Sequence, residues 1–234
     1  MNSLYLLKHS KLFDKIIIKK RNEIVKIINQ YFDNKVFYDT LDIGTTNDME
    51  FESSNHLIKN INKTKEYKSI SNQRIDSKFF KSTLNKSILE NFSKEEIKEY
   101  RSDIVVSNAT IEHVGSYVNQ LKMFSNIINL TKKYFVITTP NRFHPIDFHT
   151  KIPFIHWLPK KIHRKILSWF NLEYFSKEEN LNLLSIGDLK NLLNNYPLIK
   201  YEIFNIKFIG FISNFIIIGK INENNKNNKN NKEL

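Results

Sequence analysis

The sequence has 234 residues, of which 41% are hydrophobic and 13% aromatic, so it can fill the core of one substantial domain, and disorder of the whole chain is excluded. It contains no cysteine, which excludes a disulfide scaffold, a thiol nucleophile and any thiolate-ligated zinc or iron-sulfur site. The net charge is +12, but 31 of the 36 basic residues are lysines (36 minus five arginines). Because arginine is the preferred residue for reading bases, we interpret the charge mainly as composition bias, and nucleic acid is not the expected partner.

We identify neither a targeting segment nor a membrane-spanning segment in the sequence. The start, MNSLYLLKHSKLF, is interrupted by Lys8, His9 and Lys11 before it reaches the length of a signal peptide. The longest apolar stretch, residues 208–218, is about half of the roughly 20 residues that a spanning helix needs. We therefore expect a soluble, cytoplasmic protein.

The first half of the chain alternates between helical and strand patterns. Residues 1–35 form an N-terminal helical segment, in which apolar residues recur at helical spacing over Lys11–Phe32 and Ser10 is available as N-cap. Val36–Ile43 reads as a buried strand that ends at Gly44. The elements expected next are a helix over Ser54–Ile61, a strand over Tyr67–Asn72, a helix over Ser77–Leu84 and a strand over Lys86–Glu90.

The second half continues the alternation and ends on two adjacent strands. The elements expected are a strand over Asp103–Ser107, a helix over Ser116–Lys133, a strand over Tyr134–Thr139, a helix over Ser185–Asn195 and strands over Ile199–Phe208 and Asn214–Ile221. Repeated strand-helix alternation predicts a doubly wound α/β fold with a mainly parallel sheet. The short connection between the last two strands predicts an antiparallel pair that closes it. The Asn- and Lys-rich residues 221–234 have no apolar content to pack, and we expect them to be disordered.

Residues 140–163 differ in composition from the rest of the chain. They hold four of the five prolines and four of the seven histidines, together with Trp157. Prolines at this spacing prevent one continuous helix, and long ordered connections usually serve as lids or binding loops. We predict that residues 140–170 form an insertion that faces the substrate.

Three polar segments follow the three clearest strands. They are LDIGTTND from Leu41, SNATIEHV from Ser107 and TTPNRFHPIDFH from Thr138. In a parallel sheet the carboxyl ends of the strands lie on one edge, so these segments should converge there. The single Gly44 lets the backbone approach a ligand but matches neither a P-loop nor a dinucleotide fingerprint, which need several glycines.

The same segments resemble class I S-adenosylmethionine-dependent methyltransferases. The likeness is closest to a bacterial subgroup with a DIGTT-N-D first motif and a TPNRFHPIDFHT…HWLP insertion, and it covers roughly residues 36–220. The resemblance implies a Rossmann-like methyltransferase domain with a seven-stranded sheet whose last strand is antiparallel. It departs from most class I enzymes in having GTTND where they carry GxGxG.

The resemblance also implies a cofactor, S-adenosyl-L-methionine, and residues to hold it. Asp42, Gly44 and Thr45 would line its methionine end, with Asp48 at the amino group. Ser107 and Asn108 would lie beneath it, and Asp76 stands in for the acidic residue that usually holds the ribose. The alternative for Asp42 is a buried carboxylate that caps the following helix or turn.

The histidines of this region are candidates for catalysis. Methyl transfer from a sulfonium to a hydroxyl needs positioning and a base, and neutral imidazole suits that task near pH 7. The candidate bases or acceptor-orienting groups are His113, His149 and His144. The alternative for His113 is a histidine packed at the start of its helix. The alternative to a functional role for Glu112 is a negative charge that stabilises the N-terminus of that helix.

The candidate substrate-binding residues are Arg142, Asp147, His156 and Trp157. Arg142 is one of only five arginines, so its forked guanidinium should bind an acidic acceptor or clamp the backbone. Histidines 149, 156 and 163 share a seven-residue spacing, but Pro153 and Pro159 interrupt any helix that would align them. On this geometry we expect no metal site.

The sequence thus predicts a methyltransferase acting on a small molecule or a saccharide, with O-methylation favoured by analogy within the subgroup. The basic stretch from Lys161 to Phe170 is either a lid helix packed on the sheet or a contact with a membrane surface or lipid-linked acceptor. Two other hypotheses stay open. One is a nucleic-acid-binding module or RNA methyltransferase, and the other is a catalytically silent relative that no longer binds the cofactor.

Overall fold

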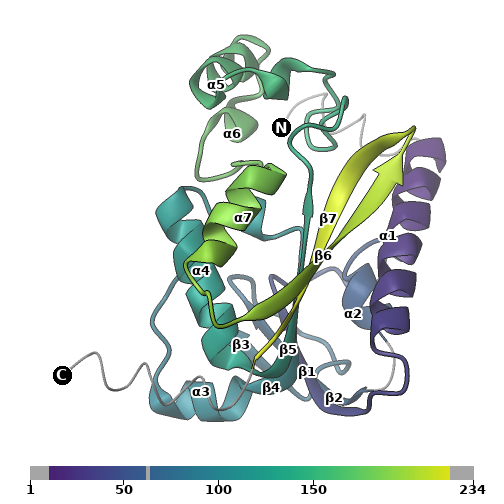
Figure 1. Ribbon diagram of the computed structural model, residues 1–234, viewed down its shortest axis with the longest axis vertical. Coiled ribbons are helices and arrows are strands. Elements are labelled where there is room, and N and C mark those ends of the chain that lie inside the picture. Colours follow the sequence, from purple (N-terminus) through teal and green to yellow (C-terminus); the bar gives the residue numbers. More distant parts are fainter. Residues whose placement is uncertain (1–10, 62–63, 222–234) are drawn as a thin grey trace.

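A computed structural model describes residues 11–61 and 64–221. Its centre is one seven-stranded sheet with the order β3-β2-β1-β4-β5-β7-β6 (Figure 1). Strands β1 to β5 run parallel to one another, and β7 is antiparallel to both of its neighbours, β5 and β6. The predicted doubly wound sheet with an antiparallel last strand is confirmed.

The strands agree closely with the buried and β-branched runs of the sequence. Their bounds are Phe37–Ile43 (β1), Thr64–Ser71 (β2), Ser82–Asn85 (β3), Ser102–Asn108 (β4), Thr131–Pro140 (β5), Lys200–Phe208 (β6) and Phe211–Lys220 (β7). Gly219 lies in β7 against the ring of Phe135, where a Cβ atom would come within 2.1 Å of the ring. Only glycine allows β7 this approach to β5.

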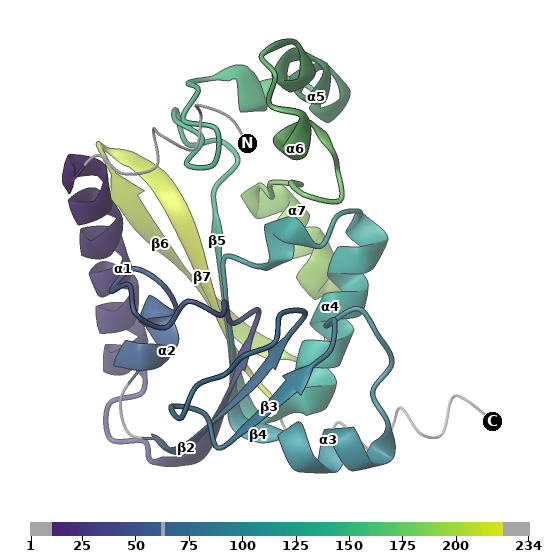
Figure 2. The same cartoon turned by 180° about the vertical axis from the view of Figure 1, so that it is seen from behind.

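Helices cover both faces of the sheet. Their bounds are Lys11–Tyr31 (α1), His56–Asn60 (α2), Lys94–Tyr100 (α3), Tyr117–Leu130 (α4), Lys160–Trp169 (α5), Glu173–Ser176 (α6) and Ile186–Asn194 (α7), with single 3-10 turns at Ile111–His113 (η2) and Ile155–Trp157 (η3). Helices α1 and α2 lie on one face and α3, α4 and α7 on the other, while α5 and α6 stand beyond the end of β5 (Figures 1 and 2).

Two hydrophobic clusters result from this layering. Alternate residues of one strand enter different clusters: Val105 of β4 packs with α4 and α7, whereas Ile104 and Val106 pack with α1 and α2. Side chains of a β-strand alternate between faces, so a strand buried on both faces must be apolar throughout, as DIVVS is. The interior strands are therefore readable from sequence as short continuous apolar runs.

Two predicted elements in the middle of the chain are wrong. Residues 77–84 are not a helix, and the strand expected at 86–90 lies earlier, at Ser82–Asn85. Phe80 and Leu84 have helical spacing, but the Lys81 amide donates to the Tyr67 carbonyl and the segment pairs with β2 at the edge of the sheet. Tyr67 also stacks on Phe79 with ring centroids 4.7 Å apart. Tertiary pairing overrides a weak helical pattern here.

Some predictions concern residues that the structure does not describe. The Ser10 cap, the start of the N-terminal segment and residues 222–234 of the expected tail lie outside the described residues. Among residues 11–61 and 64–221, no helix has the length and apolarity needed to cross a membrane.

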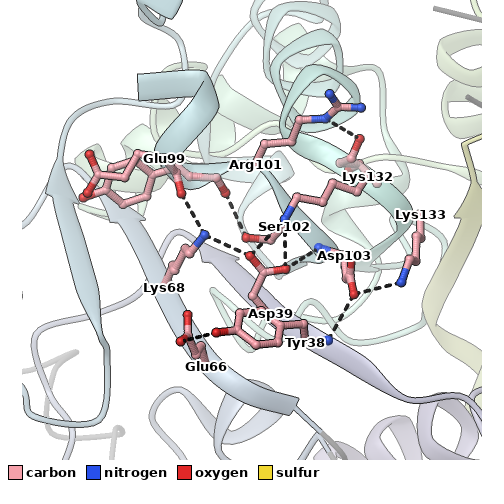
Figure 3. Close-up of polar contacts among 12 residues, drawn as sticks. Tyr38, Asp39, Glu66, Lys68, Glu99, Arg101, Ser102, Asp103, Lys132 and Lys133 are labelled. Atoms are coloured by element: carbon pink, nitrogen blue, oxygen red, sulfur yellow. Dashed lines mark hydrogen bonds and ion pairs between the residues drawn. The ribbon is translucent and has the colours of Figure 1, made fainter. Parts of the chain in front are cut away.

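The amino ends of the strands carry a network of ion pairs (Figure 3). Buried Asp39 of β1 accepts a hydrogen bond from the Asp103 amide of β4 and pairs with Lys68 at 2.9 Å and Lys132 at 3.2 Å. Burial alone would raise the pKa of Asp39, but the Asp103 amide and the two lysines outweigh burial and hold that pKa below its ordinary value. Asp103 in turn pairs with Lys133 at 3.0 Å. The acidic groups at this edge are thus satisfied by the protein itself.

Candidate functional site

The carboxyl end of β1 carries a buried polar network. The Thr45 hydroxyl donates to Asp42 Oδ2 at 2.5 Å and accepts from Ser69 of β2 at 2.8 Å, and the Thr45 carbonyl accepts from Ser71 at 2.6 Å. Burial raises the pKa of Asp42 to about 6, and the Thr45 hydrogen bond opposes that rise only in part. The ends of β1 and β2 are thereby held together directly below the exposed loop that follows β1.

Gly44 adopts a left-handed conformation with φ of +88°. A Cβ atom there would lie 2.4 Å from the Thr110 hydroxyl, so the side of Gly44 is filled by the β4–η2 loop. The glycine is required by both its backbone conformation and this contact. A bulky substitution at Gly44 would strain the loop itself, so it cannot report cleanly on ligand binding.

Asp48 and Asp76 lie in the loops after β1 and β2. Asp48 accepts hydrogen bonds from the Glu50 and Phe51 amides and from the Ser54 hydroxyl, so it organises its own loop. Burial alone would raise the pKa of Asp48, but these hydrogen bonds outweigh burial and lower it. Asp76 is exposed, five residues beyond the end of β2.

At the end of β4, Ser107 and Asn108 present polar atoms to the same edge of the sheet. The Ser107 hydroxyl is buried and has no hydrogen-bond partner within the described residues. Asn108 is half-buried and its Oδ1 accepts from the Thr138 hydroxyl of β5 at 2.6 Å. Ala109 then takes a left-handed conformation, φ of +52°, which directs the chain into η2.

The predicted insertion is built around Arg142. Its guanidinium donates to the carbonyls of His156 at 3.1 Å and Leu158 at 2.7 Å, which makes it a clamp on the backbone of the insertion. His156 and Trp157 both contact the His144 carbonyl through their ring nitrogens. Trp157 keeps 41% of its surface exposed, so its side chain reaches solvent.

His144 is held by the backbone on both sides of its ring. Its Nδ1 lies 2.8 Å from the Ile146 carbonyl and its Nε2 lies 3.4 Å from the Phe208 carbonyl, and the ring stacks on Phe148. It is 1% exposed. This geometry favours His113 and His149 over His144 as the catalytic candidates.

The structure brings His113 and His149 together with Glu112. The two imidazole rings have centroids 5.0 Å apart, and His149 Nε2 lies 3.9 Å from Glu112 Oε1. His113 Nδ1 contacts the Asn180 carbonyl at 2.7 Å, and His149 Nδ1 contacts Asp147 Oδ1 at 3.0 Å. We call Glu112, His113 and His149 the Glu-His-His cluster; it lies between the end of β4 and the insertion.

Asp147 lies behind His149 rather than at a surface. It is 3% exposed and accepts from the His149 amide and from the amide and hydroxyl of Thr150. Burial alone would raise the pKa of Asp147, but His149 outweighs burial and holds that pKa well below its usual range. Burial alone would lower the pKa of His149, but Asp147 and Glu112 outweigh it and raise that pKa.

A small basic pocket adjoins the cluster. It is lined by Arg142, Lys160, His163, Arg164, Leu181, Asn182 and Leu183. Asn182 connects the pocket to the cluster, because its amide donates to the Glu112 carbonyl at 2.7 Å. Burial lowers the pKa of His163 to about 4, so this imidazole is neutral near pH 7. The positive charge of the pocket comes from Arg142, Lys160 and Arg164.

Glu112 is the residue whose importance the sequence reading missed. The sequence reading offered it as a helix charge, but it is fully buried in η2, where its Oε2 accepts from the Thr139 hydroxyl at 3.0 Å. The signal available in the sequence was the adjacent pair Glu112-His113 four residues beyond a buried strand. His149 was a candidate from the sequence, but its position beside Glu112 and His113 could not be predicted, because it lies in the insertion 36 residues after His113.

Comparison with family profiles and with curated proteins gives no match to this sequence. Solved structures do match in fold. The plantazolicin methyltransferase BpumL in complex with SAH has a TM-score of 0.56 and 12% identity, covering 88% of this chain and 85% of that chain. A cyclopropane-fatty-acyl-phospholipid synthase-like protein from Lactobacillus casei ATCC 334 has a TM-score of 0.55 and 9% identity, covering 88% of this chain and 92% of that chain.

A third neighbour is the N-methyltransferase NodS from Bradyrhizobium japonicum WM9, with a TM-score of 0.50, 8% identity and coverage of 90% of this chain and 99% of that chain. Identities this low establish the fold and leave the acceptor open. With its strand order, its antiparallel β7 and these neighbours, the chain has the Rossmann-like fold of class I S-adenosylmethionine-dependent methyltransferases.

Proposed function

We propose that this protein is an S-adenosylmethionine-dependent methyltransferase. The observation that carries the proposal is the fold, in which the ends of β1, β2 and β4 bring polar residues to one edge of the sheet. NodS has been solved with S-adenosyl-L-homocysteine and BpumL with SAH, which supports a cofactor site in this fold. When bound, the cofactor supplies a methyl group already activated on a positively charged sulfur.

The residues at this edge fit such a cofactor. The loop after β1 leaves Gly44, Thr46 and Asn47 exposed, and Asn72 is exposed after β2, so the backbone there is open to a ligand. The unpartnered Ser107 hydroxyl adds a polar atom at the end of β4. Asp42 and Thr45 would support the methionine end, Ser107 and Asn108 would lie beneath it, and Asp48 and Asp76 are the acidic residues of the flanking loops.

We place the binding site for the methyl acceptor at the insertion, residues 140–170. His113 and His149 each keep Nδ1 on a fixed partner, which leaves Nε2 as the available ring nitrogen, and His149 Nε2 lies 3.9 Å from Glu112 Oε1. A fixed imidazole with one available nitrogen can hold an acceptor or take its proton, so a hydroxyl acceptor and O-methylation are favoured. The basic pocket beside the cluster supports a small molecule or saccharide that carries a negative charge.

Calorimetry with SAH tests the cofactor site. We expect binding of one molecule per chain and a rise in melting temperature, since a ligand that binds only the folded state stabilises it. Asp42→Asn should weaken binding about tenfold, the effect of one lost charged interaction. The matched control is Asp39→Asn, three residues earlier in β1 at the opposite edge, which should bind SAH normally below its own melting temperature. No heat and no thermal shift at millimolar SAH would contradict the proposal.

The acceptor is found by transfer of labelled methyl groups to fractions of a cell extract. We expect label in small molecules retained on an anion-exchange resin, and none when Asp42→Asn replaces the wild-type protein at low cofactor concentration. Label in material sensitive to ribonuclease would identify an RNA methyltransferase instead. SAH binding without transfer to any fraction would identify a catalytically silent relative.

A further inference from the structure

We propose that the Glu-His-His cluster is a binding site for one divalent transition-metal ion. Glu112, His113 and His149 each offer one ligand atom, and these atoms all lie within 4.8 Å of one another. Two imidazoles and one carboxylate are a ligand set typical of Zn²⁺, Mn²⁺, Fe²⁺ and Co²⁺. The evenly spaced histidines 149, 156 and 163 do not form one set. His149 packs against His113, whereas His156 and His163 pack against each other edge to face.

Glu112 is the strongest single sign of a ligand. Its side chain is 0% exposed, and its Oε1 has no hydrogen-bond partner within the described residues. A buried carboxylate oxygen left without a partner is costly, and buried charges are normally paired or bound to metals. The nearest complementary atom is His149 Nε2 at 3.9 Å, beyond hydrogen-bond distance, so the space between them suits an ion.

Each of the three side chains is oriented by a second residue. The Thr139 hydroxyl donates to Glu112 Oε2, the Asn180 carbonyl contacts His113 Nδ1, and Asp147 contacts His149 Nδ1. Metal-binding histidines usually donate their other N–H to a carboxylate or a backbone carbonyl, which fixes the tautomer and directs Nε2 at the ion. In both histidines Nδ1 contacts such a partner, and one ligand atom from each of the three side chains lies within 4.8 Å of the other two.

The size of the site requires only a small adjustment. Nitrogen and oxygen ligands at about 2.1 Å from an ion lie about 3.0–3.4 Å from one another. The separation of 3.9 Å between Glu112 Oε1 and His149 Nε2 is already close to that range. Rotation of the side chains can shorten the other separations between ligand atoms, which are at most 4.8 Å. With three protein ligands, the remaining coordination positions are open to water or to an oxygen of a bound molecule.

The consequence for catalysis rests on the proposed function. A hydroxyl bound to the ion loses its proton more readily, as metal-bound water does, so the acceptor's proton would pass to solvent water and not to an imidazole that is bound to the ion. Asn182 would then link the ion to the acceptor, because it contacts the Glu112 backbone and lines the basic pocket. Metal binding itself is a property of the cluster and needs no cofactor.

Cobalt is the probe for this site, because Co²⁺ bound by nitrogen and oxygen ligands absorbs visible light. The protein is prepared without a polyhistidine tag, treated with a chelator, desalted and titrated with CoCl₂, and Zn²⁺ binding is measured separately by calorimetry. We expect saturation at one ion per chain. Glu112→Gln and His149→Gln should each weaken binding at least tenfold, and Asp147→Asn, which acts only through His149, should weaken it by about 10–100-fold.

His56→Gln is the control, since His56 lies in α2, where its ring contacts Asn22 and the Glu52 carbonyl, and it should leave the titration unchanged. The absence of saturable binding of Co²⁺ or Zn²⁺ to the wild-type protein below about 1 mM would overturn the proposal, as would equal affinity in wild type, Glu112→Gln and His149→Gln. SAH calorimetry in the presence of chelator is run on the same protein. Its failure would count against methyl transfer and leave the metal result unaffected.

Discussion

Asp42 is a carboxyl group placed where ionisation is costly. It is 5% exposed, and within the described residues its only hydrogen bond to another side chain comes from Thr45. Perturbed carboxyl groups gather at functional sites, so the raised pKa of Asp42 agrees with the proposed cofactor site. This cost can be measured separately from any ligand.

The pH dependence of unfolding tests this property of Asp42. Its pKa is about 6 in the folded protein and about 3.9 in an unfolded chain, so stability falls as the pH rises from about 4 to about 6 and then levels off. Asp42→Asn removes this effect. We expect the variant to gain about 2–3 kcal/mol over wild type at pH 8 and little at pH 4, as measured by urea unfolding.

Asp48→Asn is the matched control and has the opposite sign. The pKa of Asp48 is lowered in the folded protein, so its contribution is present at high pH and lost as the pH falls. Its substitution should therefore destabilise the protein at pH 8 and have no effect at low pH. An equal difference between Asp42→Asn and wild type at both pH values would show that Asp42 is not a buried, high-pKa carboxyl group.

At this scale the sequence predicts position better than role. It placed Asp42 and Ser107 in the last residues of strands that exist, and the Glu112-His113 pair shortly after one, because a buried strand is recognisable from its own residues. It could not show that Thr110 fills the space beside Gly44, or that Asp147 supports His149. Those contacts join residues from loops whose paths depend on the whole fold.

Helix α5 exposes large apolar side chains to solvent. Ile162 and Trp169 lie on its exposed face, 49% and 70% exposed, and Phe170 follows at 59%. Lys161 and Lys165 lie on the same helix, and Lys165 stands 5.4 Å from the centroid of the Trp169 ring. Basic and aromatic residues on one exposed face favour binding at an anionic membrane surface.

Sedimentation with lipid vesicles tests this expectation. The protein should bind vesicles that contain an anionic phospholipid and bind neutral vesicles weakly, and salt should reduce binding because screening weakens the lysine contribution. Trp169→Glu should lower vesicle binding at least tenfold. Val118→Glu is the control, a 71% exposed apolar residue on α4. Equal binding of both variants would remove α5 from the interaction.

Elements were predictable where one pattern dominated. Strands β1, β4 and β5 and helices α1, α4 and α7 agree with the expected ranges to within a few residues. Helix α3 was not among the expected elements. Strand β3 was misplaced, because it is a four-residue edge strand with half of its residues exposed and carries too little apolar pattern to compete with the helical spacing of Phe80 and Leu84. Short edge strands take their structure from the neighbouring strand.

Across the whole molecule, the amino ends of the strands (the amino edge) and their carboxyl ends (the carboxyl edge) differ in whether buried polar groups have partners within the protein. At the amino edge, Asp39 and Asp103 are paired with lysines from neighbouring strands (Figure 3). At the carboxyl edge, the Ser107 hydroxyl and Glu112 Oε1 are buried without partners in the described structure. The acidic groups of the amino edge are therefore satisfied by contacts within the protein, whereas the carboxyl edge keeps unpartnered polar atoms among the described residues.

Removal of the central carboxylate should show that difference in stability. Asp39→Asn leaves Lys68 with a weaker partner and is expected to cost about 2–4 kcal/mol in the free energy of unfolding at pH 7. Because the pKa of Asp39 is lowered by folding, this contribution is present above about pH 4 and is lost as the pH falls below it. Chemical unfolding at pH 7 and pH 3 measures both.

Glu66→Gln is the comparison for the ion-pair network. Glu66 pairs with Lys81, whose side chain is 60% exposed, so the loss of stability should be much smaller than the loss for Asp39→Asn. A loss for Asp39→Asn as small as that for Glu66→Gln would mean that the network contributes no more than ordinary surface pairs.

The position of β7 between β5 and β6 has a consequence for biosynthesis. The chain makes β5 at residues 131–140 but supplies its antiparallel neighbour only at residues 211–220, after the insertion and α7. Until then the N–H and C=O groups along one side of β5 have no strand to pair with, and an open strand edge is a template for another chain. A nascent chain that stalls before residue 200 would leave this side of β5 unpaired and would be prone to aggregate through it.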